Sequence, residues 1–326
     1  MHSRFALIAI VAALAPAAKV AVAQSTTQYP SKPIRIIVPF APAGSTDILI
    51  RSVSQKLTEQ LGQSIVIDNR GGGGGAIGAT LAAKAAPDGY TLMATTSGVI
   101  VANPSLYRKL AYDPITDFAS VTVIAALPNM LVVSPSFAAS SVKELIATAK
   151  AKPGTLTYAS GGNGTSNHLA GELLKFLAGV NLTHVPYKGG GPAVLATISG
   201  EVSLLFATMP SAMPQVKAGK LKALAVTSRK RSDAMPDLPT MIEAGVKDFE
   251  VSTWIGVLAP RGTPVAYVNK LNAEIAKSLQ SPQVAARLRA EGYDPVGNSP
   301  AEMAALIRSE SAMWARVIKA AAITAD

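Results

Sequence analysis

The chain has 326 residues, of which 49% are hydrophobic and 15% charged, and it contains no cysteine. This composition excludes a disordered protein, a disulfide-stabilised scaffold and any cysteine-based catalysis or metal binding. Three histidines are too few for a His-rich metal or proton-relay centre. The length allows about two domains, and the formal net charge of +10 suits anionic small ligands or an acidic partner surface.

Residues 1–23 have the pattern of a cleavable export signal. Arg4 precedes an apolar run from Phe5 to Ala15 that is too short to cross a membrane, and Ala21-Val22-Ala23 fits the small-x-small cleavage rule. Cleavage would start the mature chain at Gln24 and, by removing two basic residues, lower the formal charge from +10 to +8. The alternative is an uncleaved anchor helix, which a proline and a lysine within the segment disfavour.

The first part of the mature chain alternates strand and helix patterns. The apolar run from Ile34 to Val38 predicts a buried strand, and apolar residues at spacings of three and four then predict a helix that ends at Gly62. Ser45 or Thr46 can cap this helix, and Asp47 in its first turn suits the positive end of the helix dipole. Strand–helix–strand order implies parallel pairing through crossovers. Further strands are expected over 64–68, 91–94, 121–126 and 130–134.

The remainder of the chain continues the alternation and ends in helices. Helices are expected over 142–151 and from the glycine-rich turn to about 178, with strands over 156–160, 202–207, 223–227 and 249–258. Three pairs, Thr263-Pro264, Ser281-Pro282 and Ser299-Pro300, each place a capping residue before a proline at the first helical position. We therefore expect an α/β protein whose strand over 249–258 returns to the first domain.

The turn from Phe40 to Asp47 is the first candidate binding site. A predicted strand feeds a turn that contains Gly44, and a capped helix then begins. The first N–H groups of a helix have no internal partner and carry partial positive charge, so they stabilise a carboxylate or phosphate without any charged side chain. The alternative is an ordinary strand-to-helix turn.

The segment 159–168 is the second candidate. Its three glycines let the backbone approach a ligand closely, Ser160, Thr165 and Ser166 add hydroxyl groups, and His168 falls in the first turn of the following helix. Two such turns, more than 100 residues apart, would face each other across a cleft, each presenting N–H donors to one end of an acid. The alternative is a flexible loop with a structural histidine.

A third segment, residues 184–192, contains Tyr187 and Lys188, which would line a cleft or attract anions, although a hairpin or connecting loop fits the same pattern. Other motifs are weaker. The run Gly71 to Gly75 lacks the ending of a P-loop, and the G-x-G-x-x-G match at 73–78 stands alone in a glycine tract. Asp47, Ser160 and His168 include the residue types of a catalytic triad, but nothing in the sequence indicates that they are in contact. Aromatic residues are only 5%, which together with an export signal disfavours nucleic-acid binding.

A series of short motifs spans the mature chain. These are YPxKPIRIIVPF at 29–40, GSTD at 44–47, NRxG at 69–72, PDGYTL at 87–92, DF at 117–118, the glycine-rich loop at 161–165 with His168, PYKG at 186–189, LPT at 238–240, EAG at 243–245, WxG at 254–256 and APxGTP at 259–264. Their identity and order resemble the receptors of the tripartite tricarboxylate transporter system, the Bug group of bacterial periplasmic solute-binding proteins.

The resemblance implies an α/β, two-lobed periplasmic-binding-protein fold of the Venus-flytrap, type II-like kind, with a mixed, mostly parallel sheet in each lobe. One lobe would combine residues 24–125 with 247–326, and the other would span 126–246. The protein would be a periplasmic monomer that delivers a small organic acid to the membrane permease subunits of such a transporter. It would need no cofactor, metal or catalysis. An exported enzyme acting on a small organic acid is the alternative.

In this family the ligand lies between the lobes, against the turn matching 40–47 and the loop matching 160–165. We therefore expect the ligand-binding residues to be Phe40, Ala41, Gly44, Ser45, Thr46, Asp47, Ser160, Gly161, Gly162, Asn163, Gly164, Thr165, His168, Tyr187 and Thr208. The chain departs from the family pattern where Ala43 replaces a second glycine, and where Ser203 and the neutral Ala207-Thr208 stand near a position that is often Asp. The second departure favours a simple carboxylate over an amino acid.

Overall fold

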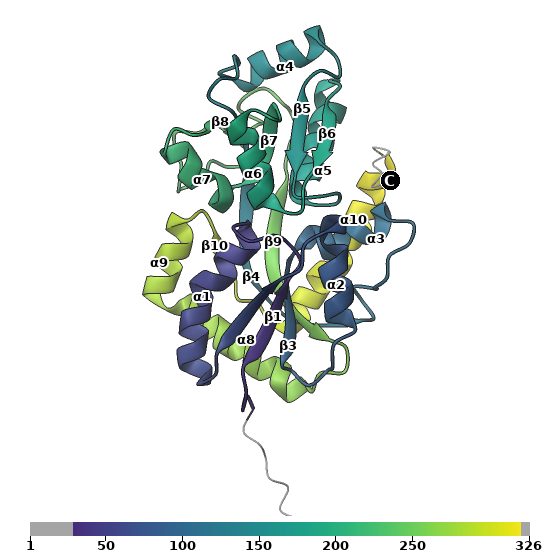
Figure 1. Ribbon diagram of the computed structural model, residues 1–326, viewed down its shortest axis with the longest axis vertical. Helices are drawn as coiled ribbons and strands as arrows, with labels where there is room; N and C mark the ends of the chain where they lie inside the picture. The colour runs from purple at the N-terminus through teal and green to yellow at the C-terminus, as the bar shows by residue number, and fades with distance from the viewer. Residues whose placement is uncertain (1–28, 321–326) are drawn as a thin grey trace, which may run out of the picture.

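The structure, a computed structural model, describes residues 29–320, so the predicted export signal lies outside the described residues. Figure 1 shows two α/β bodies, one above the other, with strands passing between them. Within residues 29–320 the strands follow the order β2-β1-β3-β9-β4-β7-β5-β6, with β10 and β8 also paired to β4.

The lower body in Figure 1 is built from both ends of the described chain. Its strands are β1 (Ile34–Val38), β2 (Ile65–Asn69), β3 (Thr91–Thr96), β9 (Ser252–Pro260), β10 (Asp294–Pro295) and the first part of β4 (Phe118–Val133). Its helices are α1 (Ser45–Leu61), α2 (Ala76–Ala83), α3 (Asn103–Leu106), α8 (Val265–Gln280), α9 (Pro282–Ala290) and α10 (Pro300–Ala320), with short helical turns at Gly73–Gly75 and Gly98–Ala102. We call this body lobe 1.

The upper body, lobe 2, comes from the middle of the chain. Its strands are the end of β4 with β5 (Thr157–Ser160), β6 (Thr183–Pro186), β7 (Leu204–Thr208) and β8 (Lys222–Val226). Its helices are α4 (Val142–Ala151), α5 (Ser166–Ala178), α6 (Gly190–Ser199) and α7 (Met209–Lys217).

Both sheets are mixed, but antiparallel pairing has a larger share than the expected mostly parallel arrangement. The crossover units pair in parallel, β1 with β2 and β3 in lobe 1, and β5 with β6 and β7 in lobe 2. The long strands β4 and β9 run antiparallel to each other and to β3, β7, β8 and β10 as they meet them. The antiparallel pair β4 and β9 joins the two lobes, and β4 pairs with strands of both.

The strand β4 is continuous, whereas the sequence predicts two strands over 121–126 and 130–134. Residues 118–128 pair with β9 in lobe 1, and residues 129–133 pair with β7 and β8 in lobe 2. Pro128 lies where the strand changes partners. A proline lacks the N–H that a residue in a central strand donates to its neighbour. It is tolerated at this position because the strand changes partners there. The expected lobe limits near 125 and 247 stay a prediction.

Each lobe has its own apolar core, and the predicted helical face of α1 contributes to the core of lobe 1. Ile50, Val53 and Leu57 are buried in one cluster with the residues of β1 and β3. Gly62 ends α1 in a left-handed conformation with φ 66°, which glycine adopts without steric cost. Of the helices within the described part of the chain, none is long and apolar enough to cross a membrane.

Candidate functional site

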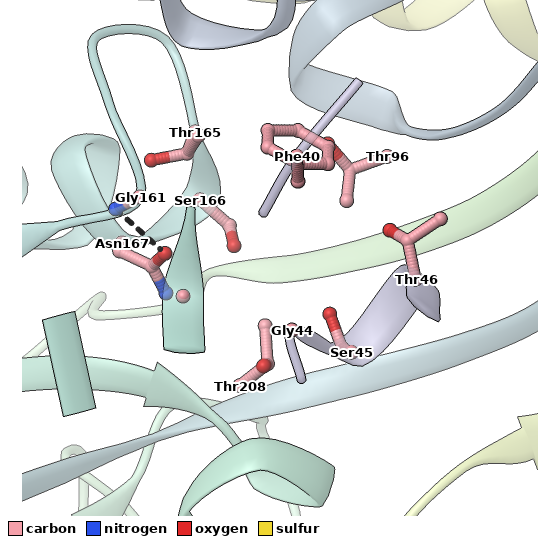
Figure 2. A pocket seen from close by; sticks show the side chains of 11 residues that line it. Phe40, Gly44, Ser45, Thr46, Thr96, Gly161, Thr165, Ser166, Asn167 and Thr208 are labelled. Carbon is pink, nitrogen blue, oxygen red and sulfur yellow. Dashed lines mark hydrogen bonds between the residues drawn. The ribbon is translucent and has the colours of Figure 1, made fainter. Parts of the chain in front are cut away.

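A small pocket lies between the two lobes, beside the turn that opens α1 (Figure 2). Its lining comes from both lobes and contains no Asp, Glu, Lys, Arg or His. The lining residues are Phe40, Gly44, Ser45, Thr46, Thr96, Gly161, Thr165, Ser166, Asn167, Gly190 and Thr208. The structure thus brings together the two turns that the sequence singles out, one from each lobe.

Lobe 1 contributes the N-terminus of α1. Gly44 is the N-cap residue and no side chain caps the helix. The backbone N–H groups of Ser45, Thr46 and Asp47 have no hydrogen-bond acceptor among residues 29–320, although all three residues are buried. A buried N–H without an acceptor costs free energy comparable to a lost hydrogen bond, so this turn favours an acceptor from a ligand.

Lobe 2 contributes three further helix N-termini. Thr165 is the N-cap of α5 without a side-chain cap, and the N–H groups of Ser166 and Asn167 have no acceptor within the described chain. Gly190 is the first residue of α6, and Thr208 is the N-cap of α7. Four helices therefore begin at one pocket, and the positive ends of their dipoles favour a bound anion.

Hydroxyl groups add further hydrogen-bonding capacity to the pocket. Figure 2 shows the side chains of Ser45, Thr46 and Thr96 on one side of the pocket and those of Thr165 and Ser166 on the other. The hydroxyl oxygens of Thr46 and Thr96 are buried and have no partner in the described residues. Thr208 instead shares a hydrogen bond with Ser211. A neutral lining rich in free donors is suited to an oxygen-rich anion.

The glycine-rich loop that precedes α5 uses its own N–H groups internally, which differs from the expectation that they would be free for a ligand. Gly161 donates to Oδ1 of Asn167 at 3.3 Å, Gly162 donates to the Ser160 hydroxyl at 3.0 Å, and Gly164 donates to Nδ1 of His168 at 3.2 Å. These three hydrogen bonds hold the loop in place, and they occupy the N–H groups of Gly161, Gly162 and Gly164. The free donors on this side belong to the first turn of α5.

Asp47 does not line the pocket. Its carboxylate instead stabilises the turn through hydrogen bonds within lobe 1. One oxygen accepts the backbone N–H of Ala43 at 3.1 Å and Nε of Arg51 at 3.0 Å. Burial opposes ionisation of this carboxyl, but the hydrogen bonds from Arg51, Ala43 and Asn69 lower its pKa below the ordinary value. The resulting ion pair leaves the charge of Asp47 compensated within lobe 1.

Seven more of the expected residues lie outside the pocket lining: Ala41, Ser160, Gly162, Asn163, Gly164, His168 and Tyr187. The N–H of Ala41 donates to the carbonyl of Lys188 at 2.9 Å, which is a direct link between the lobes. Gly162 and Asn163 lie in the part of the glycine-rich loop of lobe 2 that contacts Gly74 of lobe 1. The Tyr187 hydroxyl donates to Glu201 at 2.7 Å, and burial together with Glu201 raises its pKa to about 12. Lys188 itself is exposed.

Asp47, Ser160 and His168 do not form a catalytic triad in the structure. The Ser160 hydroxyl pairs with Nε2 of His184 at 2.6 Å, while His168 bonds Gly164 and Asp47 bonds Arg51. Ser160 is fully buried, so its hydroxyl is not presented to a substrate. Within residues 29–320, no three His, Cys, Asp or Glu side chains are grouped to hold a metal ion.

The lobes are closed over the pocket along a seam of glycines. A Cβ built on Gly74 would overlap the carbonyl oxygen of Asn163, and one built on Gly98 would overlap that of Gly164. At a third contact between the lobes, a Cβ on Gly191 of lobe 2 would lie 2.6 Å from the carbonyl oxygen of Pro42 in lobe 1. Real Cβ atoms do not approach other atoms so closely. The five-glycine run therefore has a role that the sequence did not reveal, because it lets the backbones of the two lobes touch.

The expected binding residues do not include four residues that line the pocket, Thr96, Ser166, Asn167 and Gly190. Thr96 ends β3, and Gly190 opens α6 in the segment 184–192, for which the sequence analysis left a cleft lining and a connecting loop both open. Ser166 and Asn167 are the first two residues of α5 and fall in the second candidate segment, so only Thr96 lies outside every segment that the sequence singled out. Their convergence depends on the order of strands in the two sheets.

The chain is similar to known proteins in both sequence and structure. The family model for the tripartite tricarboxylate transporter family receptor matches residues 49–323. Protein BugT of Bordetella pertussis is 37% identical over 314 residues, covering 96% of both chains. The structure of R. palustris Rpa4515 with adipate superposes with a TM-score of 0.89 at 41% identity, covering 91% of this chain and 99% of the other.

A second solved structure, MatC from Rhodopseudomonas palustris with bound malate, has a TM-score of 0.85 at 35% identity, and covers 89% of this chain and all of that one. The two-lobed periplasmic-binding-protein fold expected from the sequence is therefore confirmed. Because the family model covers most of the chain and relatives above 30% identity span it, the chain belongs to the tripartite tricarboxylate transporter receptor family of solute-binding proteins.

Proposed function

We propose that this protein is an extracytoplasmic receptor that binds a small organic acid in the pocket between its lobes. The observation that carries the proposal is the set of free, buried N–H groups at the start of α1 and α5, which meet at a pocket with no ionisable lining residue. A cation would be repelled by four helix N-termini. A neutral solute would gain less, since hydrogen bonds to a charged group contribute about 1.5–3 kcal/mol each and those between neutral groups about 1.

Two relatives point to the class of acid. The R. palustris protein was solved with adipate and MatC with malate, and both molecules carry a carboxylate at each end. In this chain one carboxylate would accept from the first turn of α1 and Thr96, and the other from the first turn of α5. Ligand binding would hold the lobes closed because the acid contacts both.

We further propose export to the periplasm by cleavage after residue 23 and delivery of the acid to membrane permease subunits. The lobes would be residues 24–125 with 247–326, and 126–246, and the receptor would act as a monomer without nucleic acid. The strand crossing at Pro128 and the return at β9 support a division near these limits. No catalysis is proposed, because the pocket lining lacks a carboxylate, histidine or cysteine.

Isothermal titration of the mature protein tests the proposal. Adipate, malate and further mono-, di- and tricarboxylates are compared with the dimethyl esters of the same diacids. We expect at least one acid to bind at micromolar concentration, which corresponds to about 8 kcal/mol, and its ester to bind at least tenfold more weakly. Equal affinity for acid and ester, or no affinity for any acid, would contradict the proposal.

A further inference from the structure

The two histidines His168 and His184 lie behind the glycine-rich loop rather than in the pocket. Their rings stack with centroids 4.3 Å apart, and His184 also stacks on Tyr158 at 4.7 Å. His168 is buried and His184 is half-buried. Neither histidine lines the pocket or carries out any step of the proposed function.

Each histidine is tied to a backbone N–H of the loop. Nδ1 of His168 accepts from Gly164 at 3.2 Å. Nε2 of His184 lies 2.6 Å from the Ser160 hydroxyl oxygen, which in turn accepts from Gly162 at 3.0 Å. A backbone N–H can only donate, so Nδ1 of His168 must be unprotonated. The loop is therefore held at Gly164 directly by His168, and at Gly162 by Ser160, which His184 contacts in turn.

The loop leads directly into the ligand-facing turn of α5. Thr165 donates its side-chain hydroxyl to the carbonyl of Gly162 at 2.7 Å, so the N-cap of α5 is attached to the same loop that the histidines hold. Gly162 and Gly164 have φ values of 119° and 79°, which are conformations that a free chain of L-residues rarely adopts. Holding these two glycines fixes the direction of the Ser166 and Asn167 N–H groups.

We propose that His168 and His184 are positioning residues, which hold the loop 160–165 in the shape that lets the N-terminus of α5 bind the acid. The inference rests on the proposed function, because it assigns the receptor's affinity in part to groups that never touch the ligand. Asn167 supports the same loop by accepting from Gly161. His168 acts directly on the loop, whereas His184 acts through Ser160.

The neutral state that this role requires agrees with the surroundings of both rings. Burial lowers the pKa of His168 to about 4 and that of His184 to about 3, and the proximity of the two histidines further lowers the pKa of His184. At neutral pH both rings are therefore uncharged. Nδ1 of His168 is then available to accept from Gly164.

The test compares two substitutions of His168 by titration with whichever acid binds the wild type. In His168→Asn, the side-chain oxygen can stand where Nδ1 stands and accept from Gly164. In His168→Leu, a side chain of similar bulk fills the site but accepts nothing. We expect His168→Leu to bind about tenfold more weakly, since a buried N–H loses its acceptor, and His168→Asn to stay within threefold of the wild type.

A stability control separates positioning from general destabilisation. Val142→Ala removes buried apolar bulk from α4 in the same lobe, remote from the loop, and should lower the melting temperature while leaving the Kd unchanged. Ser160→Ala breaks the link to His184 and should weaken binding as His168→Leu does. Wild-type Kd in both His168→Leu and Ser160→Ala overturns the inference, as does a Kd that follows melting temperature across all variants. Failure of the wild type to bind any acid would instead overturn the proposed function.

Discussion

At the scale of single residues, the pocket relies on groups whose hydrogen-bonding capacity the folded chain leaves unused. Thr46 and Thr96 are buried beside the pocket with hydroxyl oxygens that have no partner within residues 29–320. Burying an unpaired hydroxyl costs stability. Their retention is explained if the ligand supplies the missing partner.

Replacement of either threonine by valine separates stability from binding. In Thr46→Val or Thr96→Val, the free energy of unfolding should stay unchanged or rise, because an unpaired buried hydroxyl is replaced by a methyl group of similar size. Affinity for the acid should fall about tenfold or more, as expected for one lost hydrogen bond to a charged group, which contributes about 1.5–3 kcal/mol. Urea denaturation and titration of each variant measure the two effects.

Thr197→Val is the matched control. Thr197 is equally buried, but its hydroxyl donates to the carbonyl of Ala193 at 2.9 Å within α6 and lies outside the pocket lining. This variant should lose stability and keep its affinity. The account of the threonines is wrong if Thr46→Val and Thr96→Val behave as Thr197→Val does.

Ala43 carries a backbone strain that glycine would relieve. Its φ is 64°, in the left-handed region where a Cβ costs about 1–2 kcal/mol, and the expected family residue at this position is glycine. Ala43→Gly should therefore raise the free energy of unfolding by up to about 1 kcal/mol, after the greater flexibility of glycine in the unfolded chain is subtracted. A clear loss of stability in urea denaturation would contradict this assignment of strain.

At the scale of elements, the loop before α5 couples stability to pH through His168. The folded-state pKa is about 4, against an ordinary value near 6.5, with burial as the main cause, Glu172 raising it and Lys175 lowering it. The neutral ring thus stabilises the fold fully above pH 6.5. As pH falls below 6.5, protonation of the unfolded chain removes this stability, until the folded protein also binds the proton near pH 4.

Urea denaturation between pH 7 and 4.5 measures this coupling. In the wild type, His168 should contribute a decline of at most about 1.4 kcal/mol per pH unit below its ordinary pKa. Because His168→Asn has no titrating ring at this position, its stability should fall less steeply over the same range. Carboxylates that titrate in this window are common to both proteins, so parallel pH profiles would refute the shifted pKa of His168.

The elements themselves differ in how far the sequence determines them. The periodic apolar positions of α1 were predicted correctly, and so were the prolines that open α9 and α10. Helix α8 begins one residue later than predicted, with Pro264 as its N-cap and Val265 as its first residue. The continuity of β4 was not predicted, because Pro128 interrupts the local strand pattern and is tolerated only where the strand changes partners. The helices α6 and α7, whose first turns contain Pro192 and Pro210, were missed.

The pocket was predictable only in outline. The turns at Gly44 and Thr165 stand out because each joins a buried strand to the start of a helix, where backbone N–H groups favour an anion. Thr96 and His184 carry no such local signal, since their roles arise from the strand order and from a stack of rings contributed by separate segments. His168 stood out as a histidine beside glycines, but the sequence could not tell that its ring faces Gly164 and not the pocket.

At the scale of the whole molecule, closure depends on glycines that let the lobes meet backbone to backbone. Gly74 of lobe 1 lies against Asn163 of lobe 2, and Gly98 lies against Gly164. Ala41 adds an inter-lobe hydrogen bond to Lys188. Any side chain at these positions would hold the lobes apart on the side where the pocket is sealed, so it should weaken binding without touching the ligand.

Gly74→Ala tests this closure with an internal control one residue away. Both Gly73 and Gly74 have φ near 55°, but a Cβ on Gly73 would meet only Ala76 and Ile77 of lobe 1 at ordinary contact distances. Both variants should lose about 1–2 kcal/mol of stability from backbone strain, and Gly74→Ala should lose more, because its Cβ would also lie 2.7 Å from the Tyr107 hydroxyl of lobe 1. Only Gly74→Ala should bind the acid more weakly, by about tenfold or more, because its Cβ would overlap Asn163 and oppose the closed state.

Small-angle scattering with saturating acid reports the same effect directly. The liganded Gly73→Ala protein should contract like the wild type, whereas Gly74→Ala should stay more extended. Equal affinity and equal contraction of the two variants would show that the glycine seam does not control closure.

The most direct test of the account is a crystal structure of the mature protein with the acid that binds it most tightly. We predict carboxylate oxygens within about 3 Å of the N–H groups of Ser45 and Thr46 in one lobe and of Ser166 and Asn167 in the other. A carboxylate held by Lys or Arg side chains, or an acid bound away from the helix N-termini, would contradict the central claim that backbone donors from both lobes recognise the ligand.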